Sequence, residues 1–231
     1  RLPLPPPTPK HPSPPPPLPP LFPPPPLPPL PDPRQRLIDA AGELFWERGY
    51  AATGLSDILE SAGARGGSLY HFFPTKDDLL LAVIERHARV VETTIENTLA
   101  AHQEPRARVL AVVEFYRSFM RRTGCTLGCP LTNLAAEIGD SHPRAAERIG
   151  AFNDRLAQRI GEPLAEVLVA GGNAEQTARC ILAMIQGATL QARIAKGDGP
   201  LDACAGCVRA MLDGAMGVPQ VVVRAGAAVP A

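Results

Sequence analysis

The sequence lacks a net charge and long apolar runs. Its 231 residues carry 23 Lys and Arg against 23 Asp and Glu, which gives a formal net charge of zero. Apolar runs such as residues 79–84 fall far short of the roughly 18 residues that a membrane span needs. We therefore expect no transmembrane segment. The neutral charge also argues against a nucleic-acid binder that relies on a strongly basic surface, so a DNA-binding role needs local support.

Cysteine is scarce and odd in number. The five cysteines are Cys125, Cys129, Cys180, Cys204 and Cys207. Such a set fits a reducing cytoplasm better than a paired extracellular framework. Cys204 and Cys207 have the spacing of half a zinc site, but a structural zinc site needs four ligands and no second Cys or His pair stands nearby. We expect a cytoplasmic protein with neither a metal nor another cofactor.

Proline is concentrated at one end of the chain. Of the 28 prolines, 20 lie between Pro3 and Pro33. Proline fixes φ and lacks a backbone donor, so residues 1–33 are predicted to be an extended, disordered, polyproline-II-like tail. The tail is too rich in proline for the apolar part of a signal peptide. A passive leader is the simpler interpretation, and a ligand for proline-binding modules is the alternative.

From Arg34 onward, apolar residues recur with helical spacing. The first amphipathic stripe consists of Leu37, Ile38, Ala41, Leu44 and Phe45. Further helical patterns cover 55–62, a short segment from 66, 76–102, 105–122, 131–138, 143–170, 174–196 and 200–215. Thr75 is placed to cap the fourth helix. Apart from a short extended piece at 221–223, no segment alternates as a strand, and no repeat occurs. The predicted fold class is all-α.

Two of the short helices are separated only by a turn at Gly63. This spacing is typical of a helix-turn-helix, whose second helix enters the DNA major groove. On that second helix, Leu69, Phe72 and Phe73 share one face and are predicted to be buried. The opposite face presents groups that can approach bases or phosphates, namely Gly67, Ser68, Tyr70 and His71. On periodicity alone, a helical hairpin with a solvated polar face is the alternative.

Residues 34–80 also carry a specific pattern. It comprises Ala41, Leu44, Phe45, Gly49 and Tyr50, then Ala52-Thr53, Ile58, Ala62-Gly63 and the run from Gly67 to Lys76. This pattern resembles the N-terminal domain of the TetR/AcrR family of bacterial repressors. The resemblance implies an N-terminal three-helix helix-turn-helix domain at 34–80. It also implies a homodimer on a pseudo-palindromic double-stranded operator, with recognition helices one DNA turn, roughly 34 Å, apart.

The resemblance implies roles for single residues. Tyr70 and His71 would contact DNA from the recognition helix, while Thr53 and Lys76 would touch flanking phosphates. Arg65 and Gly66 depart from the Ser-Lys pair often found there, which leaves open which phosphate is bound. The predicted DNA-binding set is Thr53, Arg65, Gly67, Ser68, Tyr70, His71 and Lys76. Arg34 and Arg36 are either further phosphate contacts or solvated arginines.

Residues 81–217 are predicted to be a helical-bundle regulatory domain, followed by a tail at 218–231. The resemblance implies a ligand pocket in this bundle and dimerisation through its last two helices, 174–196 and 200–215. Their small and apolar residues allow close four-helix packing, and an intrachain core is the alternative. The candidate ligand-binding residues are Phe115, Tyr116, Phe119, Met120, Leu134 and Phe152. This set suits a hydrophobic or aromatic effector, or else an ordinary core.

The segment Gly128-Cys129-Pro130-Leu131, with Asn133 four residues after the cysteine, has a further resemblance. It is similar to a Gly-Cys-x-x-x-Asn segment of one subgroup of the family, some of whose members sense electrophiles or oxidants. A helix N-terminus favours the reactive thiolate of a cysteine placed before it. Cys129 is therefore a redox-sensing candidate and Cys125 a candidate resolving thiol. A small buried cysteine that only packs is the alternative.

Together these observations predict a ligand-responsive transcriptional regulator. The simplest form is a repressor that a small hydrophobic molecule or electrophile releases from its operator. An enzyme is not expected, because no nucleophile, base and acid cluster stands on recognisable elements. The alternative is an all-α adaptor that uses its proline-rich tail and has no DNA role.

Overall fold

The computed structural model describes residues 32–168 and 172–214, and within these ranges it contains nine α-helices and no strand. They are α1 (Pro33–Arg48), α2 (Leu55–Ser61), α3 (Gly66–Phe72), α4 (Lys76–Ala100), α5 (Pro105–Arg122), α6 (Pro130–Ile138), α7 (Pro143–Val167), α8 (Ala174–Ala195) and α9 (Gly199–Leu212). The all-α prediction is confirmed. No helix in these ranges is long and apolar enough to cross a membrane. The extended piece expected at 221–223 lies outside the described residues, as does almost all of the expected tail at 1–33.

Local sequence sets where many helices begin. Proline occupies the first or second position of α1, α5, α6, α7 and α9. Its missing N–H is tolerated there, because the first N–H groups of a helix have no intrahelical acceptor. Pro33, which the sequence assigned to the tail, is for this reason the first residue of α1. At α4, the predicted cap Thr75 accepts a hydrogen bond from the N–H of Asp78 at 3.1 Å.

The three helices of the helix-turn-helix unit pack on one another at one end of the hydrophobic core that runs through the described part of the chain. Leu37 and Phe45 of α1 are buried together with Ile58 of α2 and with Leu69 and Phe73 at α3. The predicted burial of Leu69 and Phe73 is therefore confirmed. Phe72 is only partly buried, because it packs at the edge of this core. The core fixes the orientation of α3 against α1.

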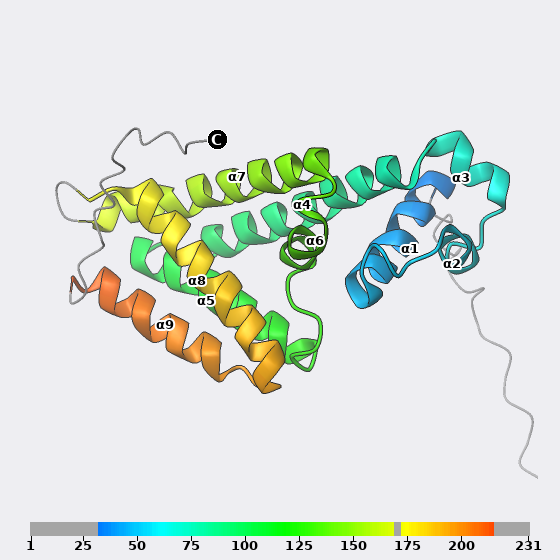
Figure 1. The fold of residues 1–231 in the computed structure, drawn as a ribbon. Helices are drawn as coiled ribbons and strands as arrows, with labels where there is room; N and C mark the ends of the chain where they lie inside the picture. The colour runs from blue at the N-terminus through cyan, green and yellow to red at the C-terminus, as the bar shows by residue number, and fades with distance from the viewer. Residues whose placement is uncertain (1–31, 169–171, 215–231) are drawn as a thin grey trace, which may run out of the picture. The chain divides into compact units, whose positions relative to one another are not determined.

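Helices α4 and α7 lie side by side and run in the same direction (Figure 1). Three ion pairs join them, and in each pair the arginine lies 63 residues after its glutamate. The pairs are Glu85–Arg148, Glu92–Arg155 and Glu96–Arg159. This constant offset requires parallel helices. It ties the long helix that leaves the helix-turn-helix unit to the bundle behind it.

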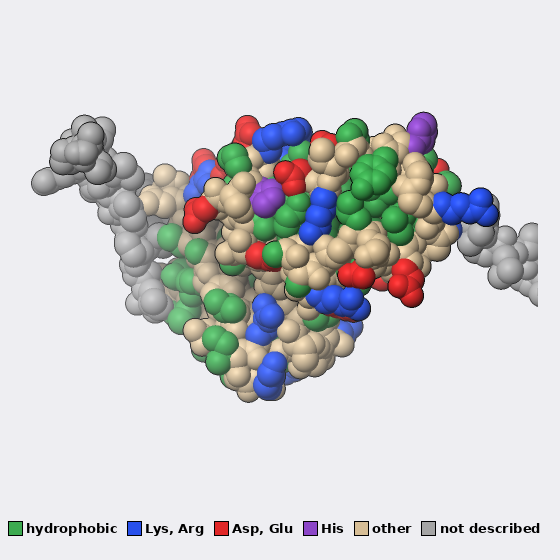
Figure 2. Space-filling model, turned by 45° about the vertical axis from the view of Figure 1, so that its right-hand side comes forward, with side chains coloured by type: hydrophobic (Ala, Val, Ile, Leu, Met, Phe, Trp, Pro, Cys, Tyr) green, Lys and Arg blue, Asp and Glu red, His purple; other side chains and the backbone are tan. Residues whose placement is uncertain are grey.

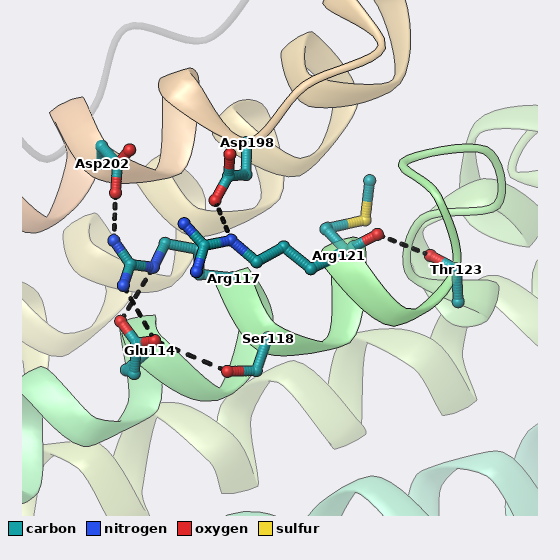
Figure 3. A network of polar contacts seen from close by, with 8 residues as sticks. Glu114, Arg117, Ser118, Arg121, Thr123, Asp198 and Asp202 are labelled. Atoms are coloured by element: carbon teal, nitrogen blue, oxygen red, sulfur yellow. Dashed lines mark hydrogen bonds and ion pairs between the residues drawn. The ribbon is translucent and has the colours of Figure 1, made fainter.

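Helices α5 and α9 pair in the opposite direction. The arginines of α5 meet aspartates from α9 and its two ends, and the later arginines meet the earlier aspartates: Arg106–Asp213, Arg117–Asp202 and Arg121–Asp198. Figure 3 shows Arg117 and Arg121 reaching from α5 toward Asp202 and Asp198. Because the paired side chains are partly solvent-exposed, each ion pair adds little to stability. Their main effect is to set how α9 is aligned along α5. They fasten α9 along the outside of α5.

Candidate DNA-binding and effector sites

The turn between α2 and α3 is held by α1. Gly63 in this turn has a φ of +57°, a left-handed conformation that favours glycine. The Arg36 guanidinium of α1 donates a hydrogen bond to the carbonyl oxygen of Ala62 at 3.2 Å. The sequence left Arg36 either as a phosphate contact or as a solvated arginine. In the structure it is neither, because its side chain stabilises this turn. Arg36 of α1 therefore helps to fix the position at which α3 begins.

The outward face of α3 presents most of the predicted DNA-binding residues. Arg65, Gly67, Tyr70 and His71 are exposed, and Ser68 is half-buried. Tyr70 keeps 61% of its surface exposed, which is unusual for a large aromatic side chain without a partner. No heavy atom lies within 4 Å of the place that a Cβ would occupy at Gly67. The α3 backbone can therefore approach a second molecule closely at this point.

Two predicted phosphate contacts, Thr53 and Lys76, turn their side chains toward the protein itself and away from the outer face of α3. The Thr53 side chain is buried, and its hydroxyl donates to the carbonyl oxygen of Gly49 at 2.7 Å. The Lys76 ammonium donates to the carbonyl oxygen of Tyr50 at 2.6 Å and lies 4.1 Å from the centroid of the Tyr50 ring. Burial lowers the pKa of Lys76, while the carboxylates of Glu137 and Asp77 act in the opposite direction. Both side chains thus connect parts of the protein itself.

The charged side chains of residues 55–76 balance, with Arg65 and Lys76 against Asp57 and Glu60. On the face that Figure 2 displays, basic, acidic and apolar side chains are interspersed and form no continuous basic patch. This agrees with the zero net charge of the chain. The DNA binding predicted for α3 would therefore have to rely on a few well-placed contacts, because the face in Figure 2 has no continuous basic patch.

A cavity of about 410 Å³ lies between the helix-turn-helix unit and the bundle. Its wall consists of Asp39, Glu43 and Trp46 of α1, Arg86, His87, Val90, Val91 and Thr94 of α4, Phe115, Tyr116, Phe119 and Arg122 of α5, and Cys129 and Pro130. Three candidate ligand-binding residues, Phe115, Tyr116 and Phe119, line it. The other three candidates are buried in the bundle core and do not line the cavity: Met120, Leu134 and Phe152.

Cys129, Tyr116 and His87 are among the polar side chains that line this mainly apolar cavity. Cys129 is the N-cap residue of α6, as its position before Pro130 predicts, and is nearly buried. Burial, and then the neighbouring Cys129, raise the pKa of the Tyr116 hydroxyl, which therefore stays protonated. Burial, and then Arg86, lower the pKa of His87, which is therefore neutral near pH 7. Cys125 is buried with a φ of +54° and does not line the cavity.

The sequence reasoning missed the contacts that join α1 to α6. Trp46 donates from Nε1 to the carbonyl oxygen of Gly128 at 2.8 Å, and its ring stacks on Phe119 with centroids 5.8 Å apart. The carboxylate of Glu137 accepts the backbone N–H groups of Tyr50 at 2.9 Å and Ala51 at 2.7 Å. The hydrogen-bonded partners are more than 80 residues apart in the chain, so no local pattern could have indicated them.

The cysteine pair of α9 shows no sign of a larger site. Burial, followed by the neighbouring Cys207, raises the pKa of the Cys204 thiol to about 11. In the part of the chain that the structure describes, no three side chains of His, Cys, Asp or Glu gather as metal ligands.

Comparison with known proteins places both halves of the chain. The family model of bacterial regulatory proteins of the tetR family matches residues 37–83. The model of the LmrA/YxaF-like transcriptional regulator C-terminal domain matches residues 105–207.

Individual relatives span most of the chain. An uncharacterized HTH-type transcriptional regulator of Mycobacterium tuberculosis is 31% identical over 74% of this chain and 89% of its own. The HTH-type transcriptional repressor NemR of Escherichia coli is 28% identical over the same shares. Among solved structures, a TetR transcriptional regulator of Chloroflexus aurantiacus superposes with a TM-score of 0.71 and 29% identity, covering 78% of this chain and 94% of that one. Reduced Escherichia coli NemR superposes with a TM-score of 0.69 and 26% identity over 77% and 96%.

Proposed function

The chain belongs to the TetR family of bacterial transcriptional regulators, which are not enzymes, and we propose that it is a ligand-responsive repressor in the cytoplasm. In this proposal, residues 34–80 bind a pseudo-palindromic operator and residues 81–217 sense an effector and dimerise. The name of the relative NemR, a transcriptional repressor, supports repression as the output. The main observation that supports DNA binding is the exposed outer face of α3.

Base recognition is assigned to the outer face of α3. Arg65, Gly67, Ser68, Tyr70 and His71 lie at or on this helix, and 61% of the Tyr70 side chain is exposed. A side chain that contacts base edges in the major groove contributes about 1–3 kcal/mol of discrimination. Thr53 is buried and its backbone N–H donates to the carbonyl oxygen of Tyr50, so Thr53 supports the face from inside. The backbone N–H of Lys76, in the first turn of α4, is the nearer route to a phosphate.

The test is a binding titration with the full chain. The operator is selected from DNA that flanks its own gene, or from genomic fragments, and affinity is measured across a salt series against excess unrelated DNA. Tyr70→Ala should weaken operator binding by about tenfold or more without changing the thermal unfolding temperature. Glu147→Ala on α7, an exposed residue far from α3 in the chain, is the control. Unchanged affinity of the Tyr70 variant would remove α3 from the interface.

In this proposal, a second copy of the chain binds to the outer faces of α8 and α9. On α8, Leu190 is 52% and Ile194 68% exposed, beside exposed Ala183 and Gly187. On α9, the exposed residues include the small side chains of Ala203 and Gly206. Apolar side chains of this size are rarely left in water along one helix face, and small residues allow helices to approach closely. These features support a four-helix dimer interface.

The effector is assigned to the cavity beside Trp46. Its aromatic wall suits a small hydrophobic or aromatic molecule, and the thiol of Cys129 in that wall suits an electrophile. Alkylation by iodoacetamide should release the wild-type protein from its operator, whereas Cys129→Ser should keep its DNA affinity and no longer respond. Release that persists in the Cys129 variant would favour a reversible ligand. Cys125 is the proposed resolving thiol, and Cys125→Ser should make oxidation by peroxide harder to reverse with dithiothreitol.

The adaptor alternative concerns the proline-rich segment, which lies almost entirely outside the described residues. A chain that begins at residue 32 should bind the operator as tightly as the longer one. A loss of binding in the shorter chain would favour a role for the tail in recognition.

A further inference from the structure

Three consecutive backbone carbonyls just before Cys129 are each held by a different helix. The bonds are Arg193 Nε of α8 to Thr126 O (3.1 Å), Asn133 Nδ2 of α6 to Leu127 O (2.7 Å), and Trp46 Nε1 of α1 to Gly128 O (2.8 Å). We name residues 126–128 the junction. Segments that are far apart in the sequence therefore meet on three adjacent peptide units.

The junction is tightly interlocked. Gly128 has a φ of +77°, and a Cβ at this position would lie 2.8 Å from Cδ of Arg193. The guanidinium of Arg193 also donates to Oδ1 of Asn133 at 2.9 Å. The structure thus explains why glycine stands at position 128 and asparagine at position 133 of the motif around Cys129. One gives Arg193 room, and the other joins the arginine to the junction.

The junction touches each part of the molecule that regulation would involve. Cys129 follows it directly, and Cys129 and Trp46 both line the cavity. Trp46 belongs to α1, the helix whose Arg36 holds the turn before α3. Arg193 precedes Ile194, the most exposed large apolar residue of α8. A displacement of the junction would therefore reach the helix-turn-helix unit and the outer face of α8 together.

We propose that the junction passes the state of the cavity to the DNA-binding helices, with Trp46, Asn133 and Arg193 as its positioning residues. The inference rests on the proposed function, because it takes the cavity as the effector site. A molecule beside Trp46, or a group added to Cys129, competes for the space in which the indole meets the Gly128 carbonyl. Adjacent peptide units are planar and joined at few torsions, so a shift at 128 also moves the acceptors at 127 and 126. The effector then favours the arrangement without these bonds.

The first test needs neither an operator nor an effector. Trp46 is the only tryptophan of the chain, so its fluorescence reports on the junction in the full-length protein. Arg193→Met removes both hydrogen bonds of the guanidinium and keeps an unbranched apolar stem in place of the arginine's methylene groups. It should shift the Trp46 emission to longer wavelength and increase quenching by acrylamide. Arg179→Met, in the same helix with ion pairs to Asp154 and Glu175, is the matched control and should change neither.

The second test separates coupling from ordinary stability. Operator affinity is measured before and after iodoacetamide treatment, with Cys129→Ser as the control for the modified thiol. The wild type should lose about tenfold or more, whereas Arg193→Met should lose less than about twofold, because its junction is already released. Arg193→Lys keeps a charge and a donor, so it should restore part of the response, and it replaces the Met variant if that protein does not fold.

A residue that only stabilises the fold would lower affinity equally with and without the modification. An unchanged ratio in Arg193→Met, or unchanged Trp46 emission, would overturn the proposal. If the wild type itself does not respond to iodoacetamide, the electrophile part of the proposed function fails, and the fluorescence test then decides on the junction.

Discussion

Replacing Glu137 by alanine should detach the end of α1 from α6. The two carboxylate oxygens accept the backbone N–H groups of Tyr50 and Ala51, at 2.9 and 2.7 Å. These N–H groups follow Gly49, at which α1 ends, and have no other acceptor in the described part of the chain. Gly49 has a φ of +90°, and a Cβ there would lie 2.8 Å from the carboxylate. The glutamate therefore sits directly against the turn.

The size of the effect follows from the two N–H groups. A hydrogen bond to a charged acceptor contributes about 1.5–3 kcal/mol, and a buried donor left unpaired costs a similar amount. The Tyr50 N–H is partly buried and counts fully, whereas the Ala51 N–H is exposed and water can replace its acceptor. We therefore expect Glu137→Ala to lower the free energy of unfolding by about 1.5–3 kcal/mol. Glu137→Gln keeps one acceptor oxygen, so its loss should be smaller.

The assay is urea unfolding, followed by far-ultraviolet circular dichroism and by Trp46 fluorescence. Glu147→Ala is the control, because this exposed glutamate of α7 makes no hydrogen bond or ion pair within the described residues. It should change the free energy of unfolding by less than about 0.5 kcal/mol. If Glu137→Ala behaves like this control, the contact between α1 and α6 contributes nothing and the reasoning is refuted.

Three other changes test separate parts of the structure. Gly128→Ala should lower thermal stability, because Gly128 has a φ of +77° and the Arg193 side chain lies close to it. Gly150→Ala, in an open stretch of α7, should raise thermal stability slightly. Equal effects of the two changes would contradict the crowding argument. Ile194→Glu should convert the proposed dimer to monomer in sedimentation measurements, and a dimer that persists in the variant would place the interface elsewhere. Burial lowers the pKa of His87, so its contribution to stability is present above about pH 6.5 and is lost as the pH falls below that value. His87→Gln should therefore flatten the decline of the unfolding temperature on acidification, and a decline as steep as that of the wild type would exclude this role.

Much of the fold could be predicted from the sequence because its causes are local. The periodic apolar stripes, the first-turn prolines and the cap at Thr75 act within a few residues, and the helices follow them closely. The same holds for Leu69 and Phe73, whose burial left Tyr70 on the outside of α3. Helix content, helix order and the face that α3 leaves exposed were therefore accessible before the structure.

The side-chain partners of the site depended on tertiary structure. Thr53 and Lys76 carry groups that suit a phosphate, yet the approach of α1 and α4 gives them backbone acceptors inside the protein. Phe115 and Met120 belong to the same apolar pattern of α5, but only Phe115 faces the cavity. Periodicity gives the face of a helix but does not distinguish packed core from cavity wall.

The sequence alone thus determined the helices, their order and the face that α3 exposes, since each depends on hydrogen bonds and apolar spacing within a few turns. Only the tertiary structure decided that Glu137 meets Tyr50, 87 residues away, and that Trp46 meets Gly128, 82 residues away. Such contacts depend on how whole helices pack, and this packing is the sum of many small interactions spread over the chain.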